Sequence, residues 1–249
     1  DFVLECMRGR DGRLFRTAGV GEAAKLPGYL EDYACLADGL IALYQASFQA
    51  RHLQAAIELA DIMLKHFADP NGPGFFFTAD DHEQLIARTK DIHDGSTPSG
   101  NAVAVMVLLK LAKLTGRDDF WKKAEETLRG FQGIMAEHPA ASGAMLAALD
   151  FYLGPVEEIA IIGKYGDPET QALLHAVHRA YQPNRVIAFH DPAAGEPPAC
   201  ALVENRPMVD GRATVYVCEN NVCRAPLVGA AALEHFSERL AGASINTCG

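Results

Sequence analysis

The sequence has little positive charge and no long apolar run. Its 22 lysine and arginine residues are outnumbered by 32 aspartate and glutamate residues, which gives a net charge of −10 at pH 7. Long-range attraction to nucleic acid or to an anionic membrane surface is therefore disfavoured. The longest apolar run, Ala102–Leu109, ends at Lys110 and is far shorter than the roughly 20 residues of a membrane-spanning helix. We expect a protein that binds neither nucleic acid nor a membrane.

The first residues also lack a targeting signal. Asp1–Glu5 has the features of neither a secretory signal peptide nor an organelle transit peptide. We expect a cytoplasmic protein, with an organelle matrix as the alternative if the sequence is a fragment that has lost its targeting segment.

Cysteine is scattered and forms no Cys-x-x-Cys motif. In a chain of 249 residues this pattern predicts reduced thiols rather than a disulfide framework. Cys218 and Cys223 form a Cys-x4-Cys pair, but no second pair completes a zinc site. The loop Gly163–Asp167 lacks the glycine patterns of nucleotide-binding loops. We therefore expect no metal and no cofactor.

Apolar residues recur at three- and four-residue steps between residues 29 and 153, which predicts five helices. Short breaks at 47–50, 69–74, 115–116 and 138–139 indicate antiparallel helical hairpins. After residue 154 the pattern predicts strands at 156–162, 186–189 and 213–218, a helix that begins at Asp167-Pro168, and a terminal helix at 230–240. The strand–helix–strand order predicts parallel strands. We expect a mainly α chain with parts at 1–153, 154–225 and 226–249.

The most informative segment is the polar loop Asp91–Asn101, which runs directly into an apolar helix. It gathers carboxylate, imidazole, hydroxyl and amide groups at one helix start, where functional sites are commonly built.

Five segments together resemble one family. They are Tyr29–Ala34, Gly74–Asp80, Arg88–Asp91, Asp94–Asn101, and Val215–Asn220 followed by Cys223. They are similar to the C-terminal region of the bacterial YyaL-like proteins, whose animal members are called spermatogenesis-associated protein 20. The resemblance implies an (α/α)6 toroid similar to those of N-acylglucosamine 2-epimerases and six-hairpin glycosidases, preceded by a thioredoxin-like domain. Because only five of the twelve toroid helices are predicted, we expect a partial toroid from a larger protein, with a small C-terminal α/β element.

Three residues are candidates for acid–base chemistry on a sugar. Such chemistry needs a proton donor or acceptor beside the ring, and the paired carboxylates of Asp94 and Asp32, both at predicted helix starts, suit this role. His93 is the candidate proton shuttle. The structural alternatives are that Asp32 stabilises its helix N-terminus, that Asp94 closes a turn, and that His93 is an ordinary packed or surface histidine.

Four further residues are candidate substrate contacts. Ser99 and Asn101 could bind a hydroxyl or anionic group, or they could simply cap backbone amides. Arg88 could contact a carboxylate or phosphate, or form an ion pair. Tyr33 could stack on a sugar ring, or it could belong to the core.

The leading hypothesis is a carbohydrate-active region of epimerase or glycosidase type, whose ligand is a sugar or another small molecule. The alternative is a non-catalytic module that binds a ligand or client while the thioredoxin-like domain performs thiol chemistry. Cys218 and Cys223 are the local indication of this alternative.

Overall fold

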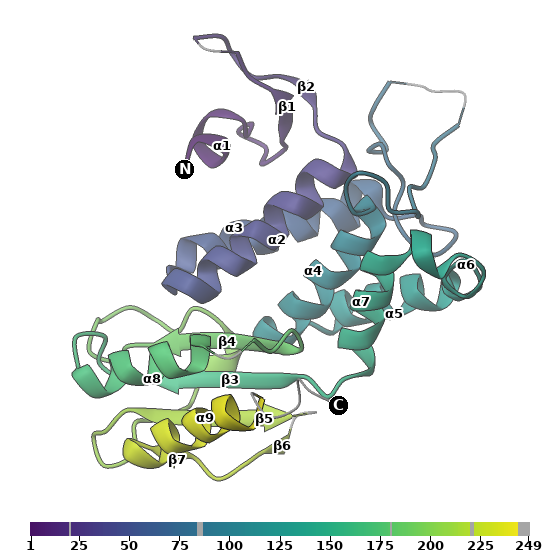
Figure 1. The fold of residues 1–249 in the computed structure, drawn as a ribbon. Coiled ribbons are helices and arrows are strands. Elements are labelled where there is room, and N and C mark those ends of the chain that lie inside the picture. Colours follow the sequence, from purple (N-terminus) through teal and green to yellow (C-terminus); the bar gives the residue numbers. More distant parts are fainter. Residues whose placement is uncertain (20, 84–86, 180, 220–221, 244–249) are drawn as a thin grey trace. The chain divides into compact units, whose positions relative to one another are not determined.

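The structure, a computed structural model, describes residues 1–19, 21–83, 87–179, 181–219 and 222–243, which form two compact units. The first unit contains residues 1–112 and 117–153. The second contains residues 113–116 together with the described residues from 154 onward. Figure 1 labels the helices and strands of both units. In the part of the chain that the structure describes, no helix is both long and apolar enough to cross a lipid bilayer.

The first unit is built from helices. They are α1 (Phe2–Cys6), α2 (Leu30–Ser47), α3 (Ala50–Ile62), α4 (Gly100–Thr115), α5 (Asp118–Gly130), α6 (Gln132–Glu137) and α7 (Gly143–Leu153). A π-helical turn, Met63–Phe67, extends α3. Strands β1 (Phe15–Thr17) and β2 (Lys25–Pro27) form a small antiparallel hairpin between α1 and α2. The helices α2 and α3 pack against each other as a helical hairpin, as the short break at 47–50 predicts.

Helices lie at all five positions that the periodicity predicts, with one change and two additions. The predicted single helix through Phe131 and Met135 is divided into α5 and α6, because Phe131 adopts φ −101° and ψ 7°. Gly130, which packs directly on the ring of Pro73, and the nearby Gly133 both weaken helix propensity at this point. The α1 helix and the β1–β2 hairpin were not predicted.

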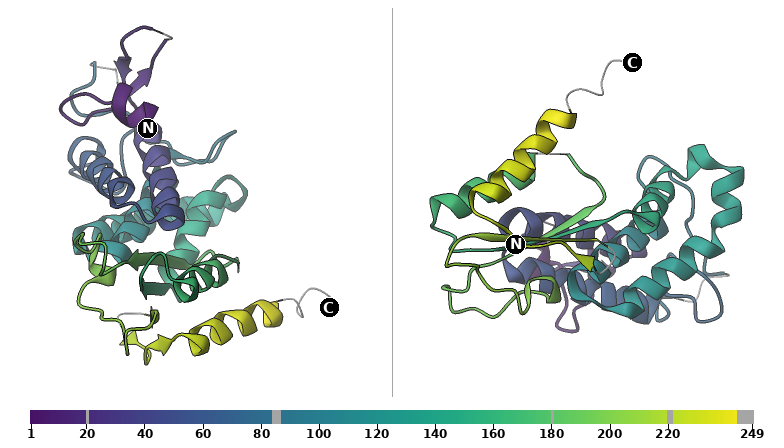
Figure 2. Two further views of the ribbon diagram at one scale, coloured as in Figure 1. Left: turned by 90° about the vertical axis from the view of Figure 1, so that its left-hand side faces the viewer. Right: turned by 90° about the horizontal axis from the view of Figure 1, so that it is seen from below.

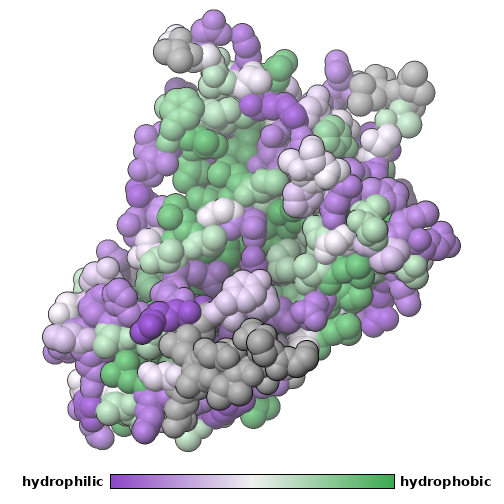
Figure 3. Space-filling view, in the orientation of Figure 1, coloured by the Kyte–Doolittle hydropathy of each residue, from purple (hydrophilic) through white to green (hydrophobic). Residues whose placement is uncertain are grey.

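The core of the first unit is apolar and aromatic. The apolar helix α4 is buried, and its Val105, Leu108 and Leu111 are fully inaccessible to solvent. The extended segment from Gly72 carries Phe75 into the same core. Leu43, which falls on the apolar stripe of α2 by its spacing, is 47% exposed. Figure 3 shows apolar surface over the helices of this unit.

The second unit is a mixed sheet with two helices. Its strands are β3 (Glu157–Ile162), β4 (Arg185–His190), β5 (Thr214–Glu219), β6 (Val222–Cys223) and β7 (Leu227–Val228), and its helices are α8 (Pro168–Arg179) and α9 (Ala230–Ala243). The order is β4-β3-β5-β6, and β7 also pairs with β5. The β3 and β4 strands are parallel, as predicted, whereas β5 runs antiparallel to β3. Figure 2 shows α8 and α9 on the same face of the sheet, and these two helices contact each other. The tail at 244–249, with Cys248, lies outside the described residues.

Gly74 fixes the course of the extended segment that enters the core. Its φ is +80°, and a Cβ built there would lie 2.5 Å from Cζ of Phe131 and 2.8 Å from Oδ1 of Asn101. Both the backbone conformation and the available space therefore require glycine.

We predict that Gly74→Ala lowers the free energy of unfolding by about 2–4 kcal/mol, through backbone strain and overpacking. Urea denaturation would measure this change. The matched control is Gly39→Ala, in the exposed middle of α2, where an added methyl meets no atom within 4 Å. The control should be stabilised by up to about 1 kcal/mol. Equal stability of the Gly74→Ala variant and the original chain would contradict the prediction.

Candidate functional site

The carboxylate of Asp94 connects two helix starts within the first unit. Its Oδ1 accepts a hydrogen bond from the backbone N–H of Ser99 at 2.9 Å, just before α4. Its Oδ2 accepts one from the backbone N–H of Ala144 at 2.8 Å, in the first turn of α7. Because amides in the first turn of a helix lack partners within the helix, a carboxylate is a favourable acceptor there. Asp94 therefore holds the polar loop against α7.

Ser99 and Asn101 are both fully buried, and their polar groups bind the backbone. Ser99 Oγ accepts a hydrogen bond from the N–H of Ala102, which caps α4. Asn101 Oδ1 accepts the N–H of Phe75 at 2.7 Å, while its Nδ2 donates to the carbonyl oxygens of Phe75 and Asp91 at 2.9 and 2.8 Å. One amide side chain thus joins the extended segment, the polar loop and α4.

A cavity of about 460 Å³ opens where the polar loop meets the start of α2. Asp32 and Glu31 line it from α2, Arg16 from β1, and Thr97 and Pro98 from the polar loop. The remaining wall is mainly apolar, with Val3, Met7, Leu14, Phe15, Leu36 and Cys35. Its size falls in the range of about 300–1,000 Å³ that is typical of small-molecule sites. The cavity combines two carboxyl groups and one guanidinium with an apolar surface.

The charged groups of the cavity are linked to one another. Arg16 lies 2.9 Å from a carboxylate oxygen of Glu31 and 3.4 Å from Oδ2 of Asp32. Asp32 Oδ2 also accepts the backbone N–H of Tyr29 at 2.8 Å, which stabilises the start of α2. Burial raises the pKa of Asp32 above its ordinary value, although the Tyr29 amide and Arg16 act in the opposite direction. Burial, reinforced by nearby carboxylates, also raises the pKa of the Cys35 thiol.

The other predicted residues lie elsewhere in the first unit. Tyr33 is fully buried, and its hydroxyl accepts the backbone N–H of Leu14 at 2.8 Å. Arg88 donates to the carbonyl oxygens of Thr78 and His66, and its guanidinium lies 4.1 Å from the centre of the Phe76 ring. His93 is exposed and packs edge to face with His138, with ring centroids 5.9 Å apart.

The structure therefore brings together only part of the predicted constellation. Asp32 and the outer part of the polar loop, Thr97 and Pro98, share the cavity. Asp94, His93, Ser99, Asn101, Tyr33 and Arg88 are not among its described lining residues. Arg16 and Glu31 line the cavity without having been predicted. Glu31 lies within the Tyr29–Ala34 string and could have been noticed there, whereas no sequence pattern marks Arg16.

One group of side chains in the first unit has the composition of a metal site. His66, Asp80 and Asp81 offer ligand atoms within 4.8 Å of one another. However, His66 is already bonded to Asp80 at 2.8 Å, and both oxygens of Asp81 accept hydrogen bonds from Arg13 at 2.8 Å. The Arg13 guanidinium lowers the pKa of Asp81. A cation bound here would have to displace Arg13 from Asp81. The absence of a metal remains a prediction from the sequence.

The prediction of reduced cysteines is wrong for one pair. Cys218 and Cys223 form a disulfide in the second unit, with Cα atoms 3.9 Å apart. They are directly opposite each other in the antiparallel pairing of β5 with β6. Cys6 and Cys35 are exposed free thiols, and Cys200 is a buried cysteine outside the disulfide. The Cys-x4-Cys spacing alone does not predict a disulfide; the strand register that places the two cysteines opposite each other is also needed.

Comparison with known proteins agrees with the family resemblance. No protein-family model matches the chain. Spermatogenesis-associated protein 20 is 38% identical over 226 residues in Rattus norvegicus and 34% identical over 226 residues in Homo sapiens. The chain is homologous to spermatogenesis-associated protein 20. An uncharacterized protein of Caenorhabditis elegans is 26% identical over 218 residues.

The homologous region is a minor part of those relatives. The alignments with spermatogenesis-associated protein 20 cover 87% of this chain and 29% of the rat and human proteins. The expected resemblance is thus confirmed as homology. The toroid arrangement and the thioredoxin-like domain stay predictions.

We predict that Asn101→Ala destabilises the first unit by about 2–4 kcal/mol, because it leaves the buried N–H and carbonyl of Phe75 without their partner. Chemical denaturation would measure this loss. Gln54→Ala is a suitable control, since Gln54 is an exposed amide on α3 whose side chain donates a hydrogen bond to the carboxylate of Glu58 at 3.0 Å. It should change the stability by no more than about 0.5 kcal/mol.

Asp32 should also make stability depend on pH. Since its folded-state pKa is raised, the protonated carboxyl is favoured by folding, and the associated stability is lost as pH rises through the folded pKa. We expect the stability of the original chain, relative to Asp32→Asn, to fall as the pH rises above about 4, the ordinary range of an aspartate carboxyl. Denaturation of both chains across this range would test the sign, and a relative gain at pH 7 would contradict it.

Proposed function

We propose that this chain is a carbohydrate-active region in which the cavity between α2 and the polar loop binds a sugar and Asp32 acts as the general acid. The observation that carries the proposal is a partly buried carboxyl with a raised pKa in a cavity of ligand size. A raised pKa makes the protonated carboxyl more available at a given pH, and a protonated carboxyl can transfer its proton to a sugar oxygen.

The neighbouring groups suit the same ligand. Glu31, the second carboxyl of the cavity, supplies the acceptor that acid–base chemistry requires, and Arg16 supplies donors for hydroxyl oxygens. The apolar wall, which includes Phe15, suits the C–H face of a sugar ring. In this scheme Asp94 is a positioning residue, because it holds Ser99 and so the adjacent Pro98 in the cavity wall.

The proposal includes the fold implied by the resemblance. We propose that the helices of the first unit are part of an (α/α) toroid, and that a thioredoxin-like domain and earlier toroid helices accompany them in the whole protein. The support is the set of shared segments, the homology with spermatogenesis-associated protein 20 and the helical hairpin formed by α2 and α3.

A second candidate function is a non-catalytic module that binds a small molecule or client. The contacts of Asp32 favour it, because this carboxylate already accepts the backbone N–H of Tyr29 and pairs with Arg16. Most of the cavity wall is apolar. A carboxylate held in this way can serve the structure and the charge balance without transferring a proton.

Asp32→Asn separates the two functions. The asparagine keeps an oxygen for the Tyr29 amide but cannot act as an acid. We expect the variant to bind N-acetylglucosamine or a related hexose within about threefold of the original affinity, and to lose at least roughly 100-fold in turnover. Binding would be measured by ligand-observed NMR with this chain, and turnover by NMR of sugar panels with the full-length protein.

Asp38→Asn is the matched control. It lies on the same helix, pairs with Lys110 at 2.8 Å and is absent from the described cavity lining. Its turnover should match that of the original protein. Sugar binding without turnover in every chain would favour the binding module, and no sugar binding by the original chain would remove the proposal.

A further inference from the structure

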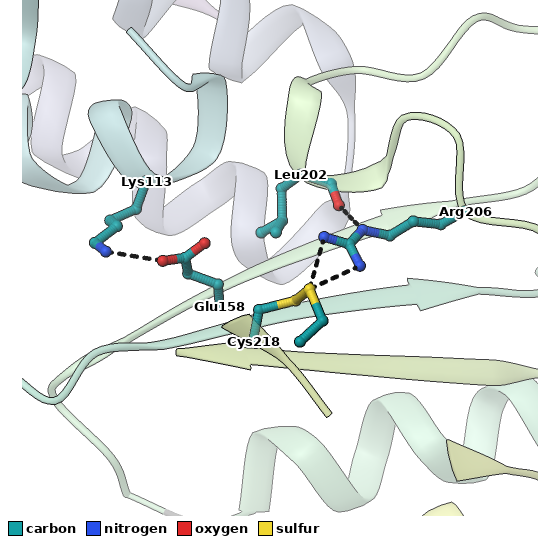
Figure 4. Close-up of a disulfide and its surroundings, with 6 residues drawn as sticks. Lys113, Glu158, Leu202, Arg206 and Cys218 are labelled. Carbon is teal, nitrogen blue, oxygen red and sulfur yellow. Dashed lines mark hydrogen bonds and ion pairs between the residues drawn. A yellow bond between two sulfur atoms is a disulfide. The ribbon is translucent and has the colours of Figure 1, made fainter. Parts of the chain in front are cut away.

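The second unit holds a sulfur pair in markedly unequal surroundings. Cys218, on β5, is 1% exposed, whereas Cys223, on β6, is open to solvent. The guanidinium of Arg206 places Nη1 and Nη2 each 3.5 Å from Sγ of Cys223 (Figure 4). An incoming molecule can therefore reach the sulfur that lies beside a positive charge and cannot reach the other.

Arg206 is held in place by groups other than the sulfur. Its Nε donates to the carbonyl oxygen of Leu202 at 2.7 Å, and its Cζ lies 5.2 Å from the centre of the Tyr216 ring. Figure 4 shows the guanidinium between the Leu202 carbonyl and the disulfide. Two donors from one fixed cation would stabilise a thiolate on Cys223 after reduction.

The opposite charge lies on the other side of the pair. Glu158, on β3, faces Cys218 directly in the antiparallel register, so their side chains share one face of the sheet. Glu158 is 7% exposed, and its carboxylate pairs with Lys113 at 2.8 Å; Figure 4 shows this pair. Burial disfavours a thiolate on Cys218. The surroundings thus assign different roles to the two sulfurs.

We propose that Cys218 and Cys223 form a redox-active pair that exchanges electrons with disulfides and thiols of other molecules, with Cys223 as the attacking sulfur and Cys218 as the resolving one. The site lies wholly in the second unit and is independent of the carbohydrate proposal. The proposal is carried by the geometry: the accessible sulfur lies beside a guanidinium that other groups hold in place.

The exchange has two steps. In the reduced chain, the Cys223 thiolate attacks one sulfur of a partner disulfide; the partner S–S bond breaks, a mixed disulfide forms, and the other partner sulfur leaves as a thiolate that takes a proton from water. Cys218 then gives its proton to water and attacks Sγ of Cys223, which breaks the mixed disulfide and releases the second partner thiolate. The partner gains two electrons, and the chain is oxidised to the Cys218–Cys223 disulfide.

The test equilibrates the chain in buffers of increasing ratio of glutathione to glutathione disulfide, followed by acid quenching, alkylation and peptide mass spectrometry. We expect the pair to pass from oxidised to reduced within that series, and Cys218→Ser to accumulate a glutathione adduct on Cys223. A parallel series with dithiothreitol distinguishes a preference for dithiols from reaction with glutathione itself. A pair that stays oxidised throughout both series, or adducts formed equally on both sulfurs, would overturn the proposal.

Arg206 provides the decisive variant. In the reduced chain at pH 7, Arg206→Gln should react with glutathione disulfide at Cys223 roughly tenfold more slowly, the effect of losing hydrogen bonds to a charged group. Arg206→Lys should recover part of the rate. The matched control is Arg224→Gln, since Arg224 is an exposed arginine next to Cys223 that pairs with Glu219; its rate should stay within about twofold. If Arg206→Gln reacts as fast as the original chain, Cys223 is not the assisted nucleophile.

Discussion

The first unit depends on a single buried amide. The side chain of Asn101 satisfies both backbone groups of Phe75 and the carbonyl of Asp91, all at the start of α4. A buried backbone group without a partner is strongly unfavourable, so this side chain allows a non-helical segment to enter a helical core. The position of the polar loop follows from that bond set, and the cavity beside Asp32 follows from the position of the loop.

The sequence predicted the features that rest on periodicity and capping. The helices repeat apolar residues at regular steps, and the parallel pairing of β3 with β4 follows from the strand–helix–strand order. Asp32 stabilises its helix start, which was the structural alternative to a catalytic role. The cavity was not predictable, because β1 and β2 are three-residue strands exposed throughout and carry no alternating pattern. Arg16 reaches Asp32 only through that hairpin.

The charges around two cysteine sulfurs, one in each unit, are of opposite sign. Burial, together with the nearby carboxylates of Glu31, Asp38 and Asp32, raises the pKa of Cys35 and so disfavours its thiolate. Cys223 faces a guanidinium instead. These environments arise from residues far apart in sequence, which explains why cysteine spacing alone misjudged the pair.

The bond between Asp94 and Ala144 has a consequence for biosynthesis. Its two ends are 50 residues apart, and the carboxylate emerges from the ribosome first. At a translation rate of about 5–20 residues per second, Ala144 is synthesised roughly 2.5–10 s after Asp94, and the hydrogen bond between them cannot form before then. During that interval the apolar α4 sequence is already translated, so nascent chains expose this apolar segment before the fold can enclose it.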